Sequence, residues 1–259
     1  MSLHPHIMAP FIVSLEGNIG SGKSTLMDHL KDHLKYVGSR PVVYVDEPLG
    51  QWESIKNKEG VGMLQLFYAD PKKYAFSFQM MAYISRLANL QQTIVNHPND
   101  IIVMERSLLT DYHVFARMLY DSTDMLEEEY AIYKTWFYHF NEIHMDALIY
   151  LECPPEVSLE RCMKRNRPGE SITLEYMTKV HERHEEWLHN LETRPLLIIE
   201  NETSSIDDSL FAVEDFLTEM VCPHDEVNHF MQNIYSSYLI TRFILGWFIF
   251  KVSSWLQKV

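Results

Sequence analysis

The chain has 259 residues, 46% hydrophobic and 22% charged, which is typical of a folded protein with a large buried core. Its 22 basic and 36 acidic residues give a net charge of −14, which argues against nucleic acid or an anionic membrane as a general partner. Three cysteines without metal-type spacing, and a start unlike a signal or transit peptide, predict a cytoplasmic protein.

Short apolar runs alternate with helical patterns along the chain. Strands are predicted at 11–15, 41–48, 101–107, 147–153 and 196–200. Helices are predicted at 22–36, 75–96, 108–119, 126–143, 155–166 and 173–191. This order predicts an α/β fold in which helices cover both faces of a parallel sheet. Ligands of such sheets collect at the carboxyl ends of the strands.

A glycine-rich loop that fits the pattern G-x-x-x-x-G-K-[ST] follows the first predicted strand and precedes the first predicted helix. Its backbone N–H groups are expected to surround the β-phosphate of ATP or another nucleoside triphosphate. Lys23 is expected to bridge the β- and γ-phosphates, and Ser24 to offer its hydroxyl group to Mg²⁺. The predicted loop site consists of Gly17, Asn18, Ile19, Gly20, Ser21, Gly22, Lys23, Ser24 and Thr25.

Two adjacent carboxylates, Asp46 and Glu47, end the second predicted strand before Pro48. Neighbouring residues of a strand point to opposite faces, so only one of the two faces the phosphate. A carboxylate there can bind the Mg²⁺ of an ATPase or accept the proton of an attacking hydroxyl group. A GTPase switch is disfavoured because the chain has no N-K-x-D motif.

Charged residues also end the third strand and a later helix. Glu105 and Arg106 place an acid and a base where the substrate is expected. Arg161 and Arg165 lie four residues apart on one helical face, and Arg167 follows just beyond it. These arginines suit either a solvated helix end favoured by the helix dipole or a lid over a transferring phosphate.

The chain resembles the deoxynucleoside kinase family, in particular deoxycytidine and deoxyguanosine kinases. The resemblance covers residues 11–217 and lies in six segments with the order and spacing of the family: EGNIGSGKST, DEPLGQW, FQMMAYISR, ERSLLTD, RCMKRNRPGE and LEYMTKVHERHEEWL. It implies a P-loop NTPase-type fold with a five-stranded parallel sheet and an arginine lid. It also implies a homodimeric salvage enzyme that transfers phosphate from a nucleoside triphosphate to the 5′-hydroxyl of a deoxynucleoside.

The resemblance assigns roles at the reacting end. Glu47 resembles the general base on the 5′-hydroxyl, and Arg106 resembles the arginine that orients this base and steadies the moving phosphoryl group. With Lys23 they form the predicted catalytic set. Glu105 resembles the acid that holds Mg²⁺ through water, and with Ser24 it forms the predicted metal site.

Further roles concern the lid and the sugar. Arg161, Arg165 and Arg167 match the lid arginines of the family, and they join the predicted ATP site. Tyr68 and Glu170 match the pair that grips the sugar 3′-hydroxyl. The chain departs from the family here, because a longer acidic stretch is common where this chain has only Pro-Gly before Glu170.

The helix predicted at 75–96 carries residues that select the base. Gln79, Ala82 and Arg86 share one face, and Gln79 offers a donor and an acceptor side by side. A buried pair between Arg86 and Asp111 is expected, because an unpaired charge in an apolar pocket is prohibitive. In the family such residues favour deoxycytidine, deoxyadenosine or deoxyguanosine over thymidine. The predicted nucleoside site consists of Ile19, Glu47, Trp52, Leu64, Tyr68, Phe78, Gln79, Ala82, Arg86, Arg106, Asp111, Phe115 and Glu170.

The resemblance divides the chain into a kinase domain, 1–221, and an apolar extension of unknown role, 222–259. Arg242 and Lys251 leave eight uncharged residues between them, too few for a membrane-spanning helix of about 20 residues. Packing on the body is favoured for the extension, with self-association or contact with a membrane interface as alternatives.

Two other functions remain open. One is a nucleoside monophosphate kinase such as thymidylate kinase, which is disfavoured because Glu47 suits a hydroxyl group, whereas a phosphate acceptor calls for an arginine. The other is a catalytically weak P-loop scaffold whose C-terminal extension recruits a partner.

Overall fold

The computed structural model describes residues 9–140, 143–167, 169–191 and 194–222. The predicted apolar extension therefore lies outside the described residues, apart from Cys222. The chain divides into two compact units, residues 1–214 and 215–259, and the boundary falls within helix α10 (Ile206–Val221). In the part of the chain that the structure describes, no helix has both the length and the apolar character needed to cross a membrane.

A six-stranded sheet forms the centre of the first unit, in the order β2-β3-β4-β1-β5-β6. The strands are β1 (Phe11–Glu16), β2 (Tyr36–Val37), β3 (Arg40–Val45), β4 (Ile101–Glu105), β5 (Ala147–Glu152) and β6 (Leu196–Glu200). Strand β2 pairs antiparallel with β3 at the edge, and the other pairings are parallel. The predicted parallel sheet of five strands is confirmed, with β2 as an addition.

The central strands are apolar because helices cover both of their faces. Ile101, Ile102 and Val103 of β4 have no exposed surface, as expected of a strand in the middle of such a sheet. In the register of the sheet, Leu15 of β1 lies beside Glu105 of β4, and Val45 of β3 lies beside Met104 of β4. The segments that follow these three strands therefore leave the sheet at one edge.

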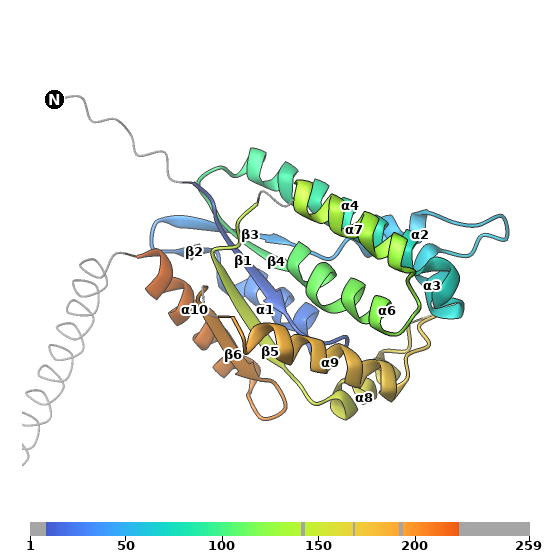
Figure 1. Cartoon of the computed structure of the whole chain (residues 1–259). Coiled ribbons are helices and arrows are strands. Elements are labelled where there is room, and N and C mark those ends of the chain that lie inside the picture. The colour runs from blue at the N-terminus through green and yellow to red at the C-terminus, as the bar shows by residue number, and fades with distance from the viewer. Residues whose placement is uncertain (1–8, 141–142, 168, 192–193, 223–259) are drawn as a thin grey trace, which may run out of the picture. The chain divides into compact units, whose positions relative to one another are not determined.

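Helices connect and cover the strands. They are α1 (Lys23–His33), α2 (Leu49–Ser54), α3 (Met63–Ala69), α4 (Pro71–Asn96), α5 (Leu108–Thr110), the π-helix η1 (Asp111–Ala116), α6 (Arg117–Asp121), α7 (Glu127–Phe140), α8 (Pro155–Arg165) and α9 (Leu174–Leu188). Figure 1 shows α4, α6, α7 and α9 in front of the sheet and α1 behind it. The predicted α/β architecture is thus confirmed.

Several predicted boundaries are wrong near the first two strands. Helix α1 ends at His33 instead of Tyr36, because Tyr36 pairs with Pro41 in the antiparallel β2–β3 hairpin. Gly38 has φ of 59°, so this glycine forms the hairpin turn and does not end the helix. Strand β3 ends at Val45, before the two carboxylates, and the short helices α2 and α3 follow without having been predicted.

The predicted helix at 108–119 is divided into α5, η1 and α6. Asp111 opens the π-helical turn, a widening that is frequent at functional sites. Helix α4 starts four residues earlier than predicted, at Pro71, because the Asp70 side chain accepts a hydrogen bond from the N–H group of Lys73 and caps the helix.

Candidate active site

A pocket of about 430 Å³ collects the segments that leave the carboxyl ends of β1, β3 and β4. Most predicted site residues line it: Ile19, Gly20, Gly22, Lys23, Ser24, Thr25, Glu47, Trp52, Leu64, Tyr68, Phe78, Gln79, Ala82, Arg86, Glu105, Arg106, Asp111, Phe115, Arg161, Arg165, Arg167 and Glu170. Gly17, Asn18 and Ser21 belong to the same loop but do not line the pocket. The position of the pocket matches the general location of ligands in parallel sheets.

Three further residues line the pocket without having been predicted: Leu49, Phe67 and Tyr176. Phe67 stacks on Phe78 with ring centroids 4.7 Å apart, and Tyr176 lies edge-on to Tyr68. The available signal was the aromatic pair Phe67-Tyr68, which the missed helix α3 carries into the pocket wall.

The glycine-rich loop adopts backbone conformations that require its glycines. Gly20 has φ of 76°, and a Cβ atom there would lie 2.3 Å from the Ser158 carbonyl oxygen. Asn18 anchors the loop to α9, because its side-chain Nδ2 donates to the Met177 carbonyl at 2.9 Å. The loop therefore packs closely against α8 and is hydrogen-bonded to α9.

Lys23 lies at the centre of this loop with 3% of its surface exposed. Its Nζ donates to the carbonyl oxygens of Gly17, at 3.0 Å, and Asn18, at 2.6 Å. Burial, and secondly the neighbouring Arg106, lower the pKa of Lys23 to about 7, against the opposing effect of nearby carboxylates such as Glu105. The free protein thus holds this lysine close to the point of deprotonation at physiological pH.

The two adjacent carboxylates after β3 point in different directions. Asp46 is exposed and pairs with Lys31 at 2.6 Å. Glu47 instead faces the pocket, where one oxygen accepts from Arg106 at 2.7 Å and from Arg86 at 3.2 Å. Burial alone would raise the pKa of Glu47, but Arg106, followed by other cations, holds it at about 2.

Arg106 begins the turn after β4 in a conformation that is rare for a residue with a side chain. Its φ is 59°, in the left-handed region that costs about 1–2 kcal/mol for an L-residue. Its backbone N–H donates to the Leu15 carbonyl at 3.0 Å, which holds this geometry. The guanidinium reaches Glu47 and also lies over the Phe115 ring at 5.3 Å.

Ser24 and Glu105 meet beside the loop. Ser24 Oγ lies 3.0 and 3.1 Å from the two carboxylate oxygens of Glu105. A hydroxyl and a carboxylate are the hard oxygen donors that Mg²⁺ prefers in nucleotide sites. The donor set thus fits the metal that the sequence predicts here.

Arg86 of α4 is buried and connects two carboxylates. Its Nε donates to Asp111 at 3.0 Å, its Nη2 to Glu47 at 3.2 Å, and its Nη1 to the Glu105 carbonyl at 3.0 Å. Although burial opposes its charge, Asp111 and then Glu47 raise the pKa of Arg86 above its ordinary value. Burial raises the pKa of Asp111, and Arg86 opposes this shift.

Arg161 and Arg165 of α8, and Arg167 just beyond its end, have different partners. Arg161 Nη2 donates to the Asn201 carbonyl at 2.9 Å. Arg165 pairs with Glu170 at 2.6 Å, and Arg167 lies 3.9 Å from the same carboxylate. Glu170, predicted to grip the sugar, is therefore bound to the two outer arginines.

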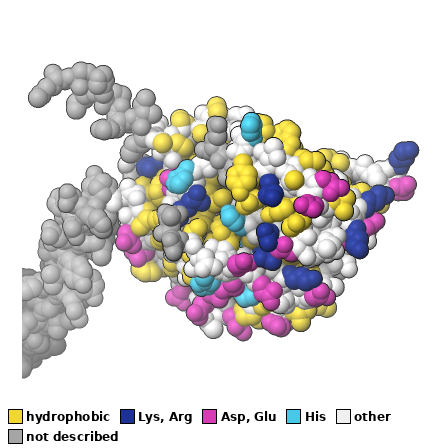
Figure 2. Space-filling view, viewed as in Figure 1, with side chains coloured by type: hydrophobic (Ala, Val, Ile, Leu, Met, Phe, Trp, Pro, Cys, Tyr) yellow, Lys and Arg dark blue, Asp and Glu magenta, His cyan; other side chains and the backbone are white. Residues whose placement is uncertain are grey.

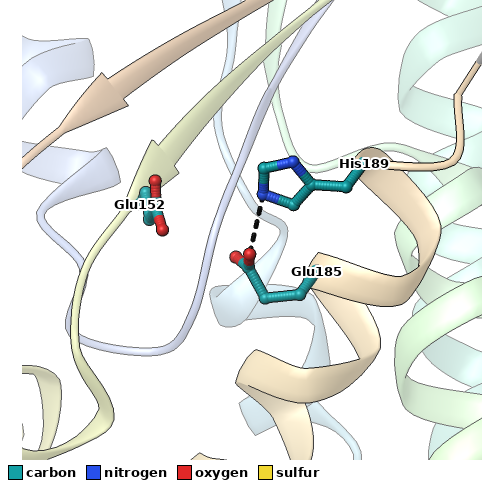
Figure 3. Close-up of side chains that lie close together, drawn as sticks. All are labelled: Glu152, Glu185 and His189. Atoms are coloured by element: carbon teal, nitrogen blue, oxygen red, sulfur yellow. Dashed lines mark ion pairs between the residues drawn. The ribbon is translucent and has the colours of Figure 1, made fainter.

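One group outside this pocket offers metal-type ligands. Among the described residues, Glu152, Glu185 and His189 place ligand atoms within 4.8 Å of one another (Figure 3). His189 Nε2 lies 2.7 Å from Glu185 Oε2, and Tyr150 donates to Glu185 Oε1 at 2.6 Å. Both Glu185 oxygens thus have partners within the protein, and His189 is half exposed. We therefore assign no metal ion to this group.

Comparison with known proteins adds evidence independent of the geometry. The deoxynucleoside kinase family model matches residues 13–222. The chain belongs to the deoxynucleoside kinase family. This match includes every residue that lines the pocket, from Ile19 to Tyr176, and it confirms the enzyme class expected from the sequence, an ATP-dependent deoxynucleoside kinase.

Individual relatives within the family are also similar to this chain. Deoxycytidine kinase of Mus musculus is 34% identical over 198 residues, which cover 68% of this chain and 74% of the relative. Deoxycytidine kinase 2 of Gallus gallus is 33% identical over 221 residues, covering 73% and 81%. Mitochondrial deoxyguanosine kinase of Xenopus laevis is 29% identical over 237 residues, covering 84% and 86%.

Proposed function

We propose that this deoxynucleoside kinase phosphorylates the 5′-hydroxyl of deoxycytidine or a purine deoxynucleoside in preference to thymidine, in nucleotide salvage. The phosphoryl donor is ATP or another nucleoside triphosphate. The observation that carries the proposal is the buried Arg86, which contacts Asp111 on one side and Glu47 on the other. Relatives named deoxycytidine and deoxyguanosine kinases support the choice of substrate.

Base selection follows from the hydrogen-bonding groups of this pocket. Asp111 accepts a hydrogen bond from the amino group of cytosine but opposes the O4 atom of thymine, which is also an acceptor. Gln79 is 2% exposed, and its Oε1 has no hydrogen-bond partner among the described residues. A buried acceptor of this kind favours a ligand that brings a donor. The base would lie between apolar walls from Ile19, Trp52, Leu64, Phe78 and Phe115.

The reacting end is suited to a hydroxyl acceptor. Glu47 accepts the hydrogen bond of the 5′-hydroxyl and takes its proton, while Arg106 keeps the carboxylate ionised and in place. With a pKa near 2, Glu47 is a weak base, which suits a loose phosphoryl-transfer transition state that needs little proton abstraction. Lys23 and the arginines of α8 balance the charge of the phosphates. Ser24 and Glu105 would hold Mg²⁺, which supplies further positive charge.

A panel of deoxynucleosides and deoxynucleoside monophosphates, each with ATP and Mg²⁺, tests this function. Turnover of deoxycytidine or a purine deoxynucleoside, with little turnover of monophosphates, is the expected result. Turnover of monophosphates alone would establish the monophosphate kinase alternative. Binding of ATP without transfer to any acceptor would favour the catalytically weak scaffold.

We also propose that the enzyme forms a homodimer through the exposed faces of α7 and of α4, which carries the exposed Ile84 and Val95. Ile132, Trp136 and Phe140 follow one another at four-residue spacing on α7, and each is more than 40% exposed. Figure 2 shows hydrophobic side chains gathered over these two helices. Sedimentation should show Trp136→Glu dissociating the dimer, whereas Phe211→Glu, at another exposed apolar side chain, should leave it intact.

Arg165→Ala is expected to lower kcat far more than it weakens nucleoside binding, because the arginine would stabilise charge that develops on the transferring phosphoryl group. Steady-state kinetics compared with direct nucleoside binding measures the difference. Lys164→Ala is a matched control, since Lys164 is 72% exposed and pairs with Glu160. If only the KM for the nucleoside rose, the arginines would serve to bind the substrate, and the proposed role as a lid over the phosphate would be wrong.

ATP binding at about pH 8 is expected to take up a proton at Lys23. Its pKa of about 7 leaves it mostly neutral there, and the charge of the triphosphate raises this pKa. At about pH 6 the lysine is already protonated, so its contribution disappears. Calorimetry in buffers of different ionisation enthalpy measures the uptake. Lys23→Arg, which stays charged, should lack it; equal uptake in both proteins would contradict the assignment.

A further inference from the structure

Glu16 is the last residue of β1, directly before the phosphate-binding loop, and it has no exposed surface. Its carboxylate accepts hydrogen bonds from three hydroxyl groups, all equally buried. Ser14 Oγ and Ser107 Oγ each lie 2.7 Å from Oε1, and Thr110 Oγ1 donates to Oε2. No ion pair between described residues includes Glu16. The buried Glu16 carboxylate, which is costly to remove from water, is therefore satisfied by hydroxyl donors.

Two of these donors, Ser107 and Thr110, belong to residues 106–110, which comprise the turn after β4 and the short helix α5 and are called the 106–110 turn below. Arg106, which opens this turn, has the left-handed φ of 59° and donates its N–H to the Leu15 carbonyl. Backbone in this region persists only where several surrounding contacts hold it. The Leu15 carbonyl fixes the start of the turn, and the Glu16 carboxylate fixes its continuation through Ser107 and Thr110.

The same turn begins with one side chain of the site and leads directly into another. The Arg106 guanidinium lies 2.7 Å from Glu47, and Asp111, the next residue after Thr110, pairs with Arg86. The Asp111 N–H also bonds to the carbonyl of Ser107 at 3.4 Å. Any shift of the turn relative to β1 would therefore move the arginine at the reacting end and the carboxylate at the base end together.

We propose that Glu16 is a positioning residue that locks the turn 106–110 to the strand preceding the phosphate loop. It keeps Arg106 against Glu47 and Asp111 against Arg86, and it touches neither substrate, since it does not line the pocket. This inference rests on the proposed function, which gives Arg106 and Asp111 their roles. Because both ends of the site depend on one carboxylate, we expect its loss to lower turnover.

Glu16→Gln is the first test. The amide keeps the size of the side chain but replaces one acceptor oxygen with a donor group that opposes the hydroxyl donors. We expect kcat to fall by about 10- to 100-fold, as for small misplacements of catalytic groups, while the KM for ATP stays near the wild-type value. Ser14→Ala is the matched control: it removes a donor to the same carboxylate from β1 itself, and its kcat should stay near wild type.

A second variant removes the hydroxyl donors of the turn and keeps the Glu16 carboxylate. The double substitution Ser107→Ala with Thr110→Val leaves Glu16 in place and frees the turn, so it should reproduce the loss of kcat even if Glu16→Gln fails to fold. Hydrogen exchange of the Arg106 amide provides a readout without turnover. It should be slow in wild type and Ser14→Ala, and faster in both turn-releasing proteins.

The outcomes separate the two proposals. If the turn-releasing proteins match Ser14→Ala in kcat and in exchange of the Arg106 amide, Glu16 is a structural residue only and the inference is overturned. If wild-type protein phosphorylates no deoxynucleoside, the proposed function fails, whereas the exchange measurement still decides whether Glu16 holds the turn.

Discussion

Glu47→Gln should lower kcat by about 10²-fold or more while nucleoside binding persists. The amide keeps the shape of the side chain but cannot take the proton of the attacking hydroxyl group. It also removes the charge that Arg106 and Arg86 share, at 2.7 and 3.2 Å. Single-turnover kinetics beside equilibrium nucleoside binding separates loss of chemistry from loss of affinity.

Asp46→Asn is the matched control for this variant, because Asp46 is adjacent in sequence but exposed and paired with Lys31. It should retain near-normal turnover. Normal kcat in Glu47→Gln together with a loss in Asp46→Asn would transfer the role to the other carboxylate.

The pH dependence of stability follows from the same contacts. The folded-state pKa of Glu47, about 2, lies below the ordinary value of 4.5, so its ion pairs stabilise the fold above about pH 4.5. This contribution is lost as the pH falls from about 4.5 towards 2, and Glu47→Gln should lack it. Acid unfolding of the two proteins measures the difference.

Arg86→Met or Asp111→Ala alone should destabilise the fold by about 3–5 kcal/mol, because each strands a buried charge. The contacts predict which of the two substitutions lowers the free energy of unfolding more. Arg86→Met leaves Asp111 without its partner, whereas Asp111→Ala leaves Arg86 bound to Glu47 and to the Glu105 carbonyl. Arg86→Met should therefore cost more. Urea unfolding measures both, and the reverse order would contradict this account.

The double variant Arg86→Met with Asp111→Ala removes both charges and opens space beside the base. It should gain activity on thymidine relative to deoxycytidine and lose its preference for bases with an amino group. The ratio of kcat/KM for the two nucleosides is the measurement. A wild-type enzyme that already prefers thymidine would refute this account of the pocket, although its place in the kinase family would stand.

Much of the fold follows from local sequence patterns. The glycine loop with its flanking strand and helix, and the apolar runs of β1, β4 and β5, are continuous in sequence, so spacing alone locates them. The pairing of Arg86 with Asp111 is also foreseeable, since a buried charge of either sign needs a partner.

Other features depend on contacts between distant segments. The residue pattern around Asp46 and Glu47 does not show which one turns inward, and only the family resemblance selects Glu47, because the choice depends on Arg106 from the turn after β4. The left-handed backbone of Arg106 and the burial of Glu16 have no local signal either, since neither residue type suggests them. The helices α2 and α3 are short, and their helical pattern is too brief to distinguish from a loop.

The position of Arg86 between Asp111 and Glu47 limits how such an enzyme can change its substrate during evolution. In the function proposed above, one side chain takes part in choosing the base and in setting the charge of the carboxylate at the reacting end. On this proposal, a lineage that moves towards thymidine one substitution at a time is expected to pass through a less stable protein. The two changes are therefore epistatic, and a stabilising substitution elsewhere has to come first for the path to be open.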